Sequence, residues 1–129
     1  MTEFTVPIEK LTLSNDYFRQ VLFTGKHAQL VLMSLHPGEE IGSEVHPNVD
    51  QFFRIEQGTA NFIFNGKETH PAKDGDAVIV PAGTFHNVVN SSKTAKLKLY
   101  TIYSPPNHPD KTVHQTKADA EKAEAEKNH

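Results

Sequence analysis

The sequence predicts an all-β fold in which short strands form a sandwich or a barrel. Short apolar runs alternate with turn-forming residues every eight to twelve positions, and no helical period of apolar residues occurs before residue 115. Asn65-Gly66 is the strongest hairpin signal in the chain, because a type I′ turn needs positive φ at both positions. A chain of 129 residues is about the size of one domain with one modest core.

Three strands are predicted in the first part of the chain. Apolar residues alternate with other residues over positions 4–8, which is a strand period, and Pro7 suits the edge of a sheet. Residues 14–16 are typical of a turn. A second strand is predicted over 17–24. The third, over 29–36, is a short apolar run between turn signals and fits a buried strand.

The middle of the chain contains five further predicted strands. The last of them alternates cleanly, so that the odd-numbered residues from Leu97 to Tyr103 share one face and the even-numbered residues from Lys96 to Ile102 share the other. The five predicted strands cover residues 51–56, 59–64, 76–80, 84–89 and 96–103.

The C-terminal part of the chain has a different character. Residues 1–105 hold all the predicted strands and form the predicted β domain, whereas residues 106–129 form a proline-containing loop and a helical tail. Thr116 can cap this helix, but its apolar residues are all alanine, so we expect a solvated helix outside the core. His108 and His114 in the loop are expected to be solvated rather than folded over the barrel mouth.

The overall composition excludes several classes of function. The net charge is −3 with histidine neutral, so the chain offers no basic surface for nucleic acid or an anionic membrane. No apolar run approaches the roughly 18 residues that span a bilayer, and the N-terminal residues lack the pattern of a signal peptide. Because the chain has no cysteine, disulfides and sulfur-ligated zinc are excluded. We therefore expect a cytoplasmic protein.

Residues 38–58 carry most of the polar side chains that point to a functional site. Glu44 and His46 are two positions apart, so their side chains share a face in an extended segment. Gln51 begins the next predicted strand, on the same face as apolar residues of that strand. A buried carboxylate or amide is costly without a partner. A divalent cation would satisfy both groups.

His86, which follows a Pro-Ala-Gly turn, would complete this set of ligands. Taken alone, a histidine such as His86 is more often a core or surface residue, and Glu44 could be an ordinary exposed acid, so the joint spacing is what favours a metal. Nitrogen and oxygen ligands without sulfur suit iron(II), manganese, nickel, cobalt or zinc. With one anionic ligand the site would keep a charge of about +1 and would polarise an oxygen-rich ligand.

The spacing of these residues resembles the two motifs of the cupin family. The resemblance covers roughly residues 20–103 and implies a double-stranded β-helix, the jelly-roll barrel of cupins, here with a short C-terminal helical tail. The first motif, G-x(5)-H-x-H-x(3,4)-E-x(6)-G, is matched in its frame by Gly38, Glu44, His46, Gln51 and Gly58. The second, G-x(5)-P-x-G-x(2)-H-x(3)-N, is matched at every fixed position by Gly75, Pro81, Gly83, His86 and Asn90.

Two departures from the first motif define what the resemblance implies for the site. Glu44 stands where the family has its first histidine, and Gln51 stands where it has glutamate, a substitution also seen in some non-oxidative cupins. The implied ligands of one divalent metal ion are therefore Glu44, His46, Gln51 and His86, with Glu44 acting as a ligand or as a general base. An alternative register that pairs His46 with Asn48 breaks the glycine spacing.

Several functions stay open at this point. The chain is similar to small bacterial cupins labelled mannose-6-phosphate-isomerase-like, a label that rests on fold alone. It could be a small metalloenzyme of isomerase, cyclase or lyase type that acts on an oxygen-rich small molecule, or an iron-dependent dioxygenase. It could also be a non-catalytic small-molecule-binding cupin, or hold a purely structural metal. The expected partners are a small-molecule ligand or substrate and a second copy in a homodimer, with no nucleic acid and no membrane.

Overall fold

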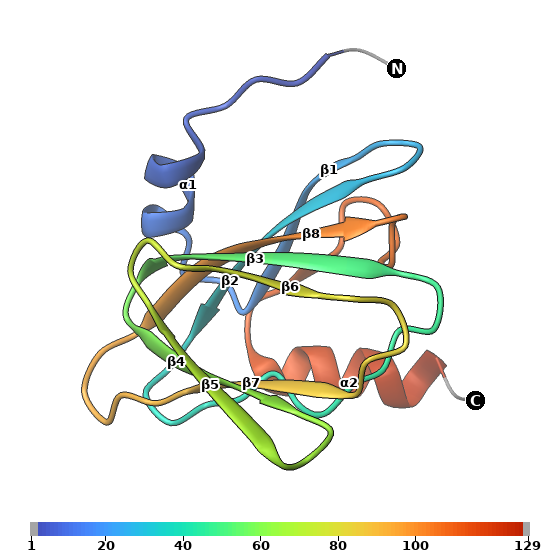
Figure 1. Ribbon diagram of the computed structural model, residues 1–129. Coiled ribbons are helices and arrows are strands. Elements are labelled where there is room, and N and C mark those ends of the chain that lie inside the picture. Colours follow the sequence, from blue (N-terminus) through green and yellow to red (C-terminus); the bar gives the residue numbers. More distant parts are fainter. Residues whose placement is uncertain (1–2, 128–129) are drawn as a thin grey trace.

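The computed structural model describes residues 3–127, which form two antiparallel β-sheets that face each other (Figure 1). The larger sheet contains β1 (Arg19–Thr24), β2 (Gln29–Leu35), β3 (Asp50–Gln57), β6 (Ala77–Val80), β8 (Leu97–Ser104) and β9 (Val113–His114), in the order β6-β3-β8-β2-β1-β9. The smaller sheet contains β4 (Thr59–Phe64), β5 (Glu68–Lys73) and β7 (His86–Asn90), in the order β5-β4-β7. The outermost residues of the predicted domain ranges, 1–2 and 128–129, lie outside the described part.

The strands and the hairpin expected after residue 16 are confirmed. Asn65 and Gly66 have φ values of 56° and 71°, as a type I′ turn between β4 and β5 requires. In β8 the odd-numbered residues from Leu97 to Tyr103 are all buried. Because β8 lies between β2 and β3, these side chains pack into the core from the middle of the larger sheet. The core therefore fills the space between the two sheets.

The strand predicted over positions 4–8 was wrong, because a helix, α1 (Ile8–Ser14), begins there. Pro7 directly precedes it, a position where the missing N–H of proline costs nothing. Ile8, Leu11 and the fully buried Thr12 follow a helical spacing, and the Thr12 hydroxyl donates to the Ile8 carbonyl at 2.7 Å. The helix packs on the outside of the larger sheet (Figure 1).

Two strands carry too little apolar pattern to be predicted. β5 is exposed at every position except Ala72 and contains Pro71, which is compatible only with the sheet edge that it occupies. β9 has two residues and pairs with the start of β1, where His114 lies opposite Arg19. Both strands depend on a partner strand rather than on their own sequence pattern.

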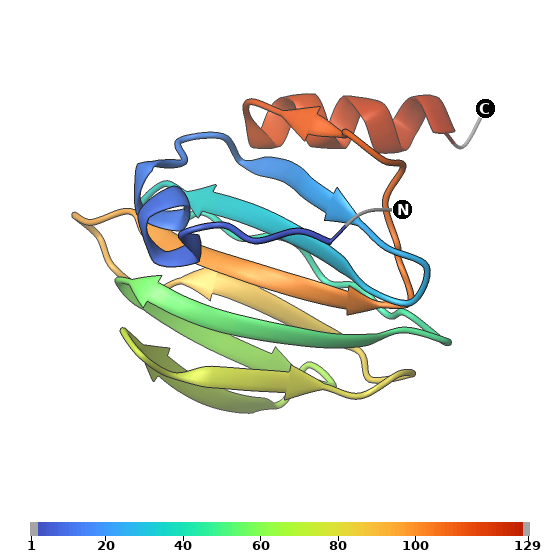
Figure 2. The ribbon, with the colours of Figure 1, turned by 90° about the horizontal axis from the view of Figure 1, so that it is seen from above.

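The tail forms a helix, α2 (Lys117–Lys127), as predicted. Thr116 caps it: the Asp119 amide donates to the Thr116 hydroxyl at 3.1 Å, and the Asp119 carboxylate accepts from the Thr116 amide at 3.3 Å. The helix lies beside the β9 edge of the larger sheet (Figure 2), and Ala120 packs against the core. Most of α2 is solvated as expected, but one face covers part of the barrel. No helix within residues 3–127 is long and apolar enough to cross a membrane.

Replacing Asn90 by alanine is expected to lower the free energy of unfolding by about 2–3 kcal/mol, because several buried backbone groups then lose their partner. The Asn90 amide donates to the carbonyls of Leu35, His36 and Ala95, and its oxygen accepts from the Ser92 amide. Asn90 therefore has a structural role at the end of β7. Urea unfolding measures the change. Asn61→Ala, at a half-buried position on β4, should shift stability by less than about 0.5 kcal/mol, and equal losses in both variants would refute the assignment.

Candidate metal centre

Glu44 and His86 are held directly opposite each other by their backbones. The Glu44 amide donates to the His86 carbonyl at 2.8 Å, and the His86 amide donates to the Glu44 carbonyl at 2.9 Å. Residues paired in this way project their side chains to the same face. The Gly83 amide donates to the His46 carbonyl at 2.8 Å, and its φ of 84° favours glycine, as expected for that turn. Two distant motifs are thereby held side by side.

Three of the four predicted ligands meet at this point. Glu44, His46 and His86 each offer one ligand atom, and these three atoms all lie within 4.8 Å of one another. The His46 Nε2 and Glu44 Oε2 atoms are 3.7 Å apart, and the two imidazole rings have centroids 5.6 Å apart. The cluster is therefore compact enough to hold one metal ion.

The hydrogen bond of His86 determines which of its ring nitrogens is available. His86 is 3% exposed, and its Nδ1 lies 2.9 Å from the Thr84 carbonyl oxygen. A carbonyl only accepts, so Nδ1 carries the proton and Nε2 keeps a free lone pair. An imidazole whose other nitrogen donates to a backbone carbonyl is the arrangement found in metal-binding histidines.

His46 is in the neutral form that a metal ligand needs. Burial lowers the pKa of His46, and this outweighs the opposing effect of the nearby Glu44 carboxylate. At neutral pH the contact with Glu44 is therefore not an ion pair but the approach of two ligand atoms. His46 Nε2 is fully buried and has no hydrogen-bond partner within the part of the chain that the structure describes. Such an atom is costly unless it binds something.

Gln51 has its amide direction fixed by a hydrogen bond to Thr101. The Thr101 hydroxyl donates to the Phe52 carbonyl at 2.8 Å, so it can only accept from Gln51 Nε2, at 2.9 Å. This leaves Gln51 Oε1 buried and without a partner among the described residues. Gln51 is paired across the sheet with Tyr103, whose ring contacts the His46 ring edge-on at 5.9 Å. The role of Gln51 as a fourth ligand stays a prediction.

The residues present fit a divalent metal ion. Within residues 3–127, an imidazole nitrogen of His46 and the amide oxygen of Gln51 are buried and have no hydrogen-bond partner. Together with a Glu44 carboxylate and the free nitrogen of His86, they form a nitrogen and oxygen donor set without sulfur. These donors leave the identity of the metal open among the first-row divalent ions.

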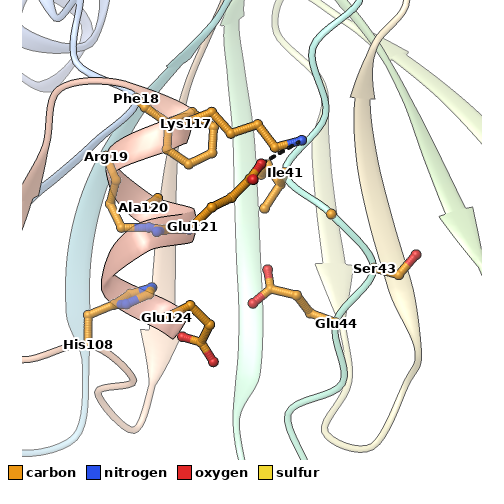
Figure 3. Close-up of a pocket in the computed structure, with 11 residues that line it drawn as sticks. Phe18, Arg19, Ile41, Ser43, Glu44, His108, Lys117, Ala120, Glu121 and Glu124 are labelled. Carbon is orange, nitrogen blue, oxygen red and sulfur yellow. Dashed lines mark ion pairs between the residues drawn. The ribbon is translucent and has the colours of Figure 1, made fainter. Parts of the chain in front are cut away.

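A cavity of about 240 Å³ adjoins the cluster (Figure 3). A second cavity of about 340 Å³ continues from it past His46, and both are lined by Glu44, His108 and Glu124. Figure 3 shows Arg19 and His108 on one side of the space and Glu44 on the other, with α2 alongside. The metal centre is therefore accessible from a space large enough for a small molecule.

The expectation that His108 is solvated was wrong, because the loop that carries it is fixed at the cavity wall. The fully buried Gln29 accepts from the amides of Asn107 and His108, at 3.0 Å each, and donates to the His108 carbonyl at 2.7 Å. His108 Nε2 then lies 3.2 Å from the Tyr103 hydroxyl. A buried glutamine at the start of a strand was the signal that could have indicated this.

Arg19 is the other residue that the sequence reasoning missed. It lines the cavity from β1 and is 7% exposed. Its signal was its position, since Arg19 and the buried Val21 share one face of the strand. An arginine at an inward position of a barrel strand is unusual enough to mark a site.

Comparison with known proteins decides the family. A family model described as a cupin domain matches residues 31–103, which is more than half of the chain. The chain belongs to the cupin family. Its fold is accordingly the cupin double-stranded β-helix, as the two facing antiparallel sheets indicate.

The chain is similar to proteins from three sources. The uncharacterized protein YrkC of Bacillus subtilis is 54% identical over 126 residues, which cover 94% of this chain and 67% of that protein. The uncharacterized protein L612 of Acanthamoeba polyphaga mimivirus is 50% identical over 108 residues, covering 82% of this chain and 68% of that protein. A crystal structure of a Bacillus halodurans protein is 45% identical, with a TM-score of 0.91, over 94% of this chain and 95% of that chain.

Acidification is predicted to destabilise the metal-free cupin between the lowered pKa values of His46 and His114 and their ordinary value of 6.5. Burial is the main cause of lowering at both residues. In this window the unfolded chain binds more protons than the folded chain, so the free energy of unfolding decreases as the pH is lowered. Above the ordinary pKa value both histidines are neutral in either state, and their contribution to stability is fully present. Urea unfolding with a chelator, on both sides of that pH, measures the effect. His46→Gln should reduce the slope, and an unchanged slope would contradict the prediction.

Proposed function

We propose that this cupin binds one divalent metal ion through Glu44, His46, Gln51 and His86 and acts on an oxygen-rich small molecule in the adjoining cavity. The observation that carries the proposal is the convergence of three ligand atoms within 4.8 Å, beside buried His46 and Gln51 atoms that lack partners among the described residues. A purely structural site is less well supported, because a cavity reaches the ligands.

The chemistry favoured by the surrounding residues is non-oxidative isomerase, cyclase or lyase chemistry. The bound metal would supply a Lewis acid that polarises a substrate oxygen. Burial raises the pKa of the Tyr103 hydroxyl, so this group stays protonated and can donate a hydrogen bond toward His108 or a ligand. The Glu44 side chain is 32% exposed at the cavity and can hold a proton there if it is not itself a ligand.

The metal site is tested by elemental analysis of the protein purified without added metal. We expect about one divalent ion per chain and a higher melting temperature with the metal than after chelation. His86→Ala and Glu44→Gln should each weaken metal binding at least about tenfold, because mutating even a residue that only hydrogen-bonds to a metal ligand typically has an effect of that size. His27→Ala, at an exposed turn, is the matched control and should bind normally. Full metal content in His86→Ala would overturn the proposal.

The metal found also separates the enzymatic alternatives. If iron is bound, oxygen consumption with catechols and diketones tests the dioxygenase alternative. If a redox-inactive metal is bound and a ligand binds without turnover, the non-catalytic binding cupin is favoured instead.

We further propose that the cupin forms a homodimer through the outer face of its larger sheet. Phe52 on β3 is paired with Ile79 on β6 and with Ile102 on β8, which places three apolar side chains side by side on the face away from the core. Ile79 is 65% exposed, and the Phe52 ring lies 6.2 Å from the Tyr100 ring. An apolar row of this kind on a sheet is typical of an association surface.

Ile79→Glu is expected to convert a dimer into a monomer, because a carboxylate in an apolar contact loses its hydration. Light scattering after size-exclusion chromatography measures the mass. Val113→Glu, at an exposed apolar position on β9 away from this row, should leave the mass unchanged. A monomeric wild-type protein, or a dimer that persists in Ile79→Glu, would refute this interface.

A further inference from the structure

We propose that Arg19 forms an anion-binding site beside the candidate metal centre and that this site takes the carboxylate group of a small hydroxy- or oxo-carboxylate. The inference deepens the proposed function by naming the chemical class of the ligand. Arg19 precedes the region matched by the cupin domain, which covers residues 31–103. Because a guanidinium is positively charged whether or not a metal is bound, the anion site can be tested independently of the metal.

Arg19 is a buried cation without a counter-charge. Its side chain reaches the cavity from β1 and is 7% exposed. The Nη1 atom lies 3.3 Å from Nδ1 of His114, whose pKa is lowered by burial, and the guanidinium lies 5.3 Å from the centre of the Phe18 ring. The Arg19 side chain also interacts with the Tyr103 hydroxyl, which is neutral because burial raises its pKa. Its Nε has no hydrogen-bond partner and no carboxylate pairs with it, as judged over residues 3–127. A buried charge of this kind is stabilised by an opposite charge in direct contact, and among the described residues no carboxylate lies at ion-pairing distance from Arg19.

The second cation at the cavity is already occupied. Lys117 Nζ lies 3.9 Å from the Glu121 carboxylate (Figure 3), so their charges offset each other. Arg19 is therefore the lining cation whose charge is available to a ligand. Arg19 and Glu44 line the same cavity of about 240 Å³, and Glu44 belongs to the ligand cluster. A ligand held by Arg19 thus lies within reach of the ligand cluster.

The chemistry of the wall favours a carboxylate over a phosphate. A guanidinium presents parallel N–H groups that match the two oxygens of either anion. However, Glu44, Glu121 and Glu124 also line the cavity, and they repel a dianion more strongly than a monoanion. The cavity of about 240 Å³ suits a small molecule. A carboxylate on Arg19 would leave the hydroxyl or carbonyl end of the ligand to face Glu44 and the histidines.

The test uses the fact that the chain has two arginines, Arg19 and Arg54. Nitrogen-15 NMR of the full chain therefore resolves two side-chain Nε–H signals, and Arg54→Gln assigns the remaining one to Arg19. Arg54 lies elsewhere, with its Nε 2.9 Å from the Glu56 carboxylate, so it also serves as the control arginine. Glycolate is the probe, ethylene glycol is its neutral analogue, and inorganic phosphate is the competing anion. Titrations are run without metal and with zinc, which is diamagnetic.

Glycolate is expected to shift the Arg19 signal and not the Arg54 signal, while ethylene glycol shifts neither. Arg19→Met, which keeps an unbranched apolar stem, should bind glycolate about tenfold or more weakly with zinc binding unchanged. Arg54→Gln should bind both normally. The wild-type titration stands by itself if Arg19→Met does not fold.

An unshifted Arg19 signal at saturating glycolate would overturn the inference, as would tighter binding of phosphate or equal glycolate affinity in Arg19→Met. If zinc fails to bind but glycolate still shifts Arg19, the metal proposal fails and the anion site stands. If zinc binds and Arg19 does not respond to glycolate, the metal proposal stands and the anion site fails.

Discussion

The structure of the site depends on one backbone interaction, the bridge between Glu44 and His86. Two hydrogen bonds of 2.8 and 2.9 Å join an otherwise irregular segment to the start of β7. Because directly opposed residues share a face, this pairing brings a carboxylate and an imidazole together without any specific contact between the side chains. His46, two positions further along the same segment, then falls within the same cluster. A shift of one residue in this pairing would turn Glu44 or His86 away from the cluster.

The second constraint is the burial of polar atoms that have no hydrogen-bond partner. It applies both at the ligand cluster and at Arg19. The described residues contain three buried side-chain atoms without partners, on Arg19, His46 and Gln51. The last two are a neutral nitrogen and an oxygen, which suit a cation, whereas the first belongs to a cation and suits an anion. A metal ion and a carboxylate would satisfy all three groups and would also stabilise each other. Arg19 and Glu44 line one cavity, and Glu44 and His46 line the next, so one small molecule could contact both the cation and the ligand cluster.

Features that depend on local sequence patterns could be predicted, whereas features that depend on contacts across the fold could not. The strands and the Asn65-Gly66 turn were predictable because their patterns are local, and the ligand cluster was predictable because motif spacing fixes the pairing of Glu44 with His86. The helix at Ile8 was missed because a few apolar residues fit both a strand and a helix period. Arg19 and the His108 loop were missed because contacts across the fold, such as those made by Gln29, determine their surroundings.

The residues around the candidate site lie both inside and outside the segment that the cupin domain matches. The predicted metal ligands all lie in the segment matched by the cupin domain, which ends at residue 103. Arg19, His108 and Glu124, which line the cavity, all lie outside it. The residues of the candidate metal centre thus come from the matched cupin segment, while the flanking strand, loop and helix supply part of the cavity wall. Since Arg19 is a buried cation of that wall, the proposed preference for an anionic ligand rests on β1 rather than on the metal motifs.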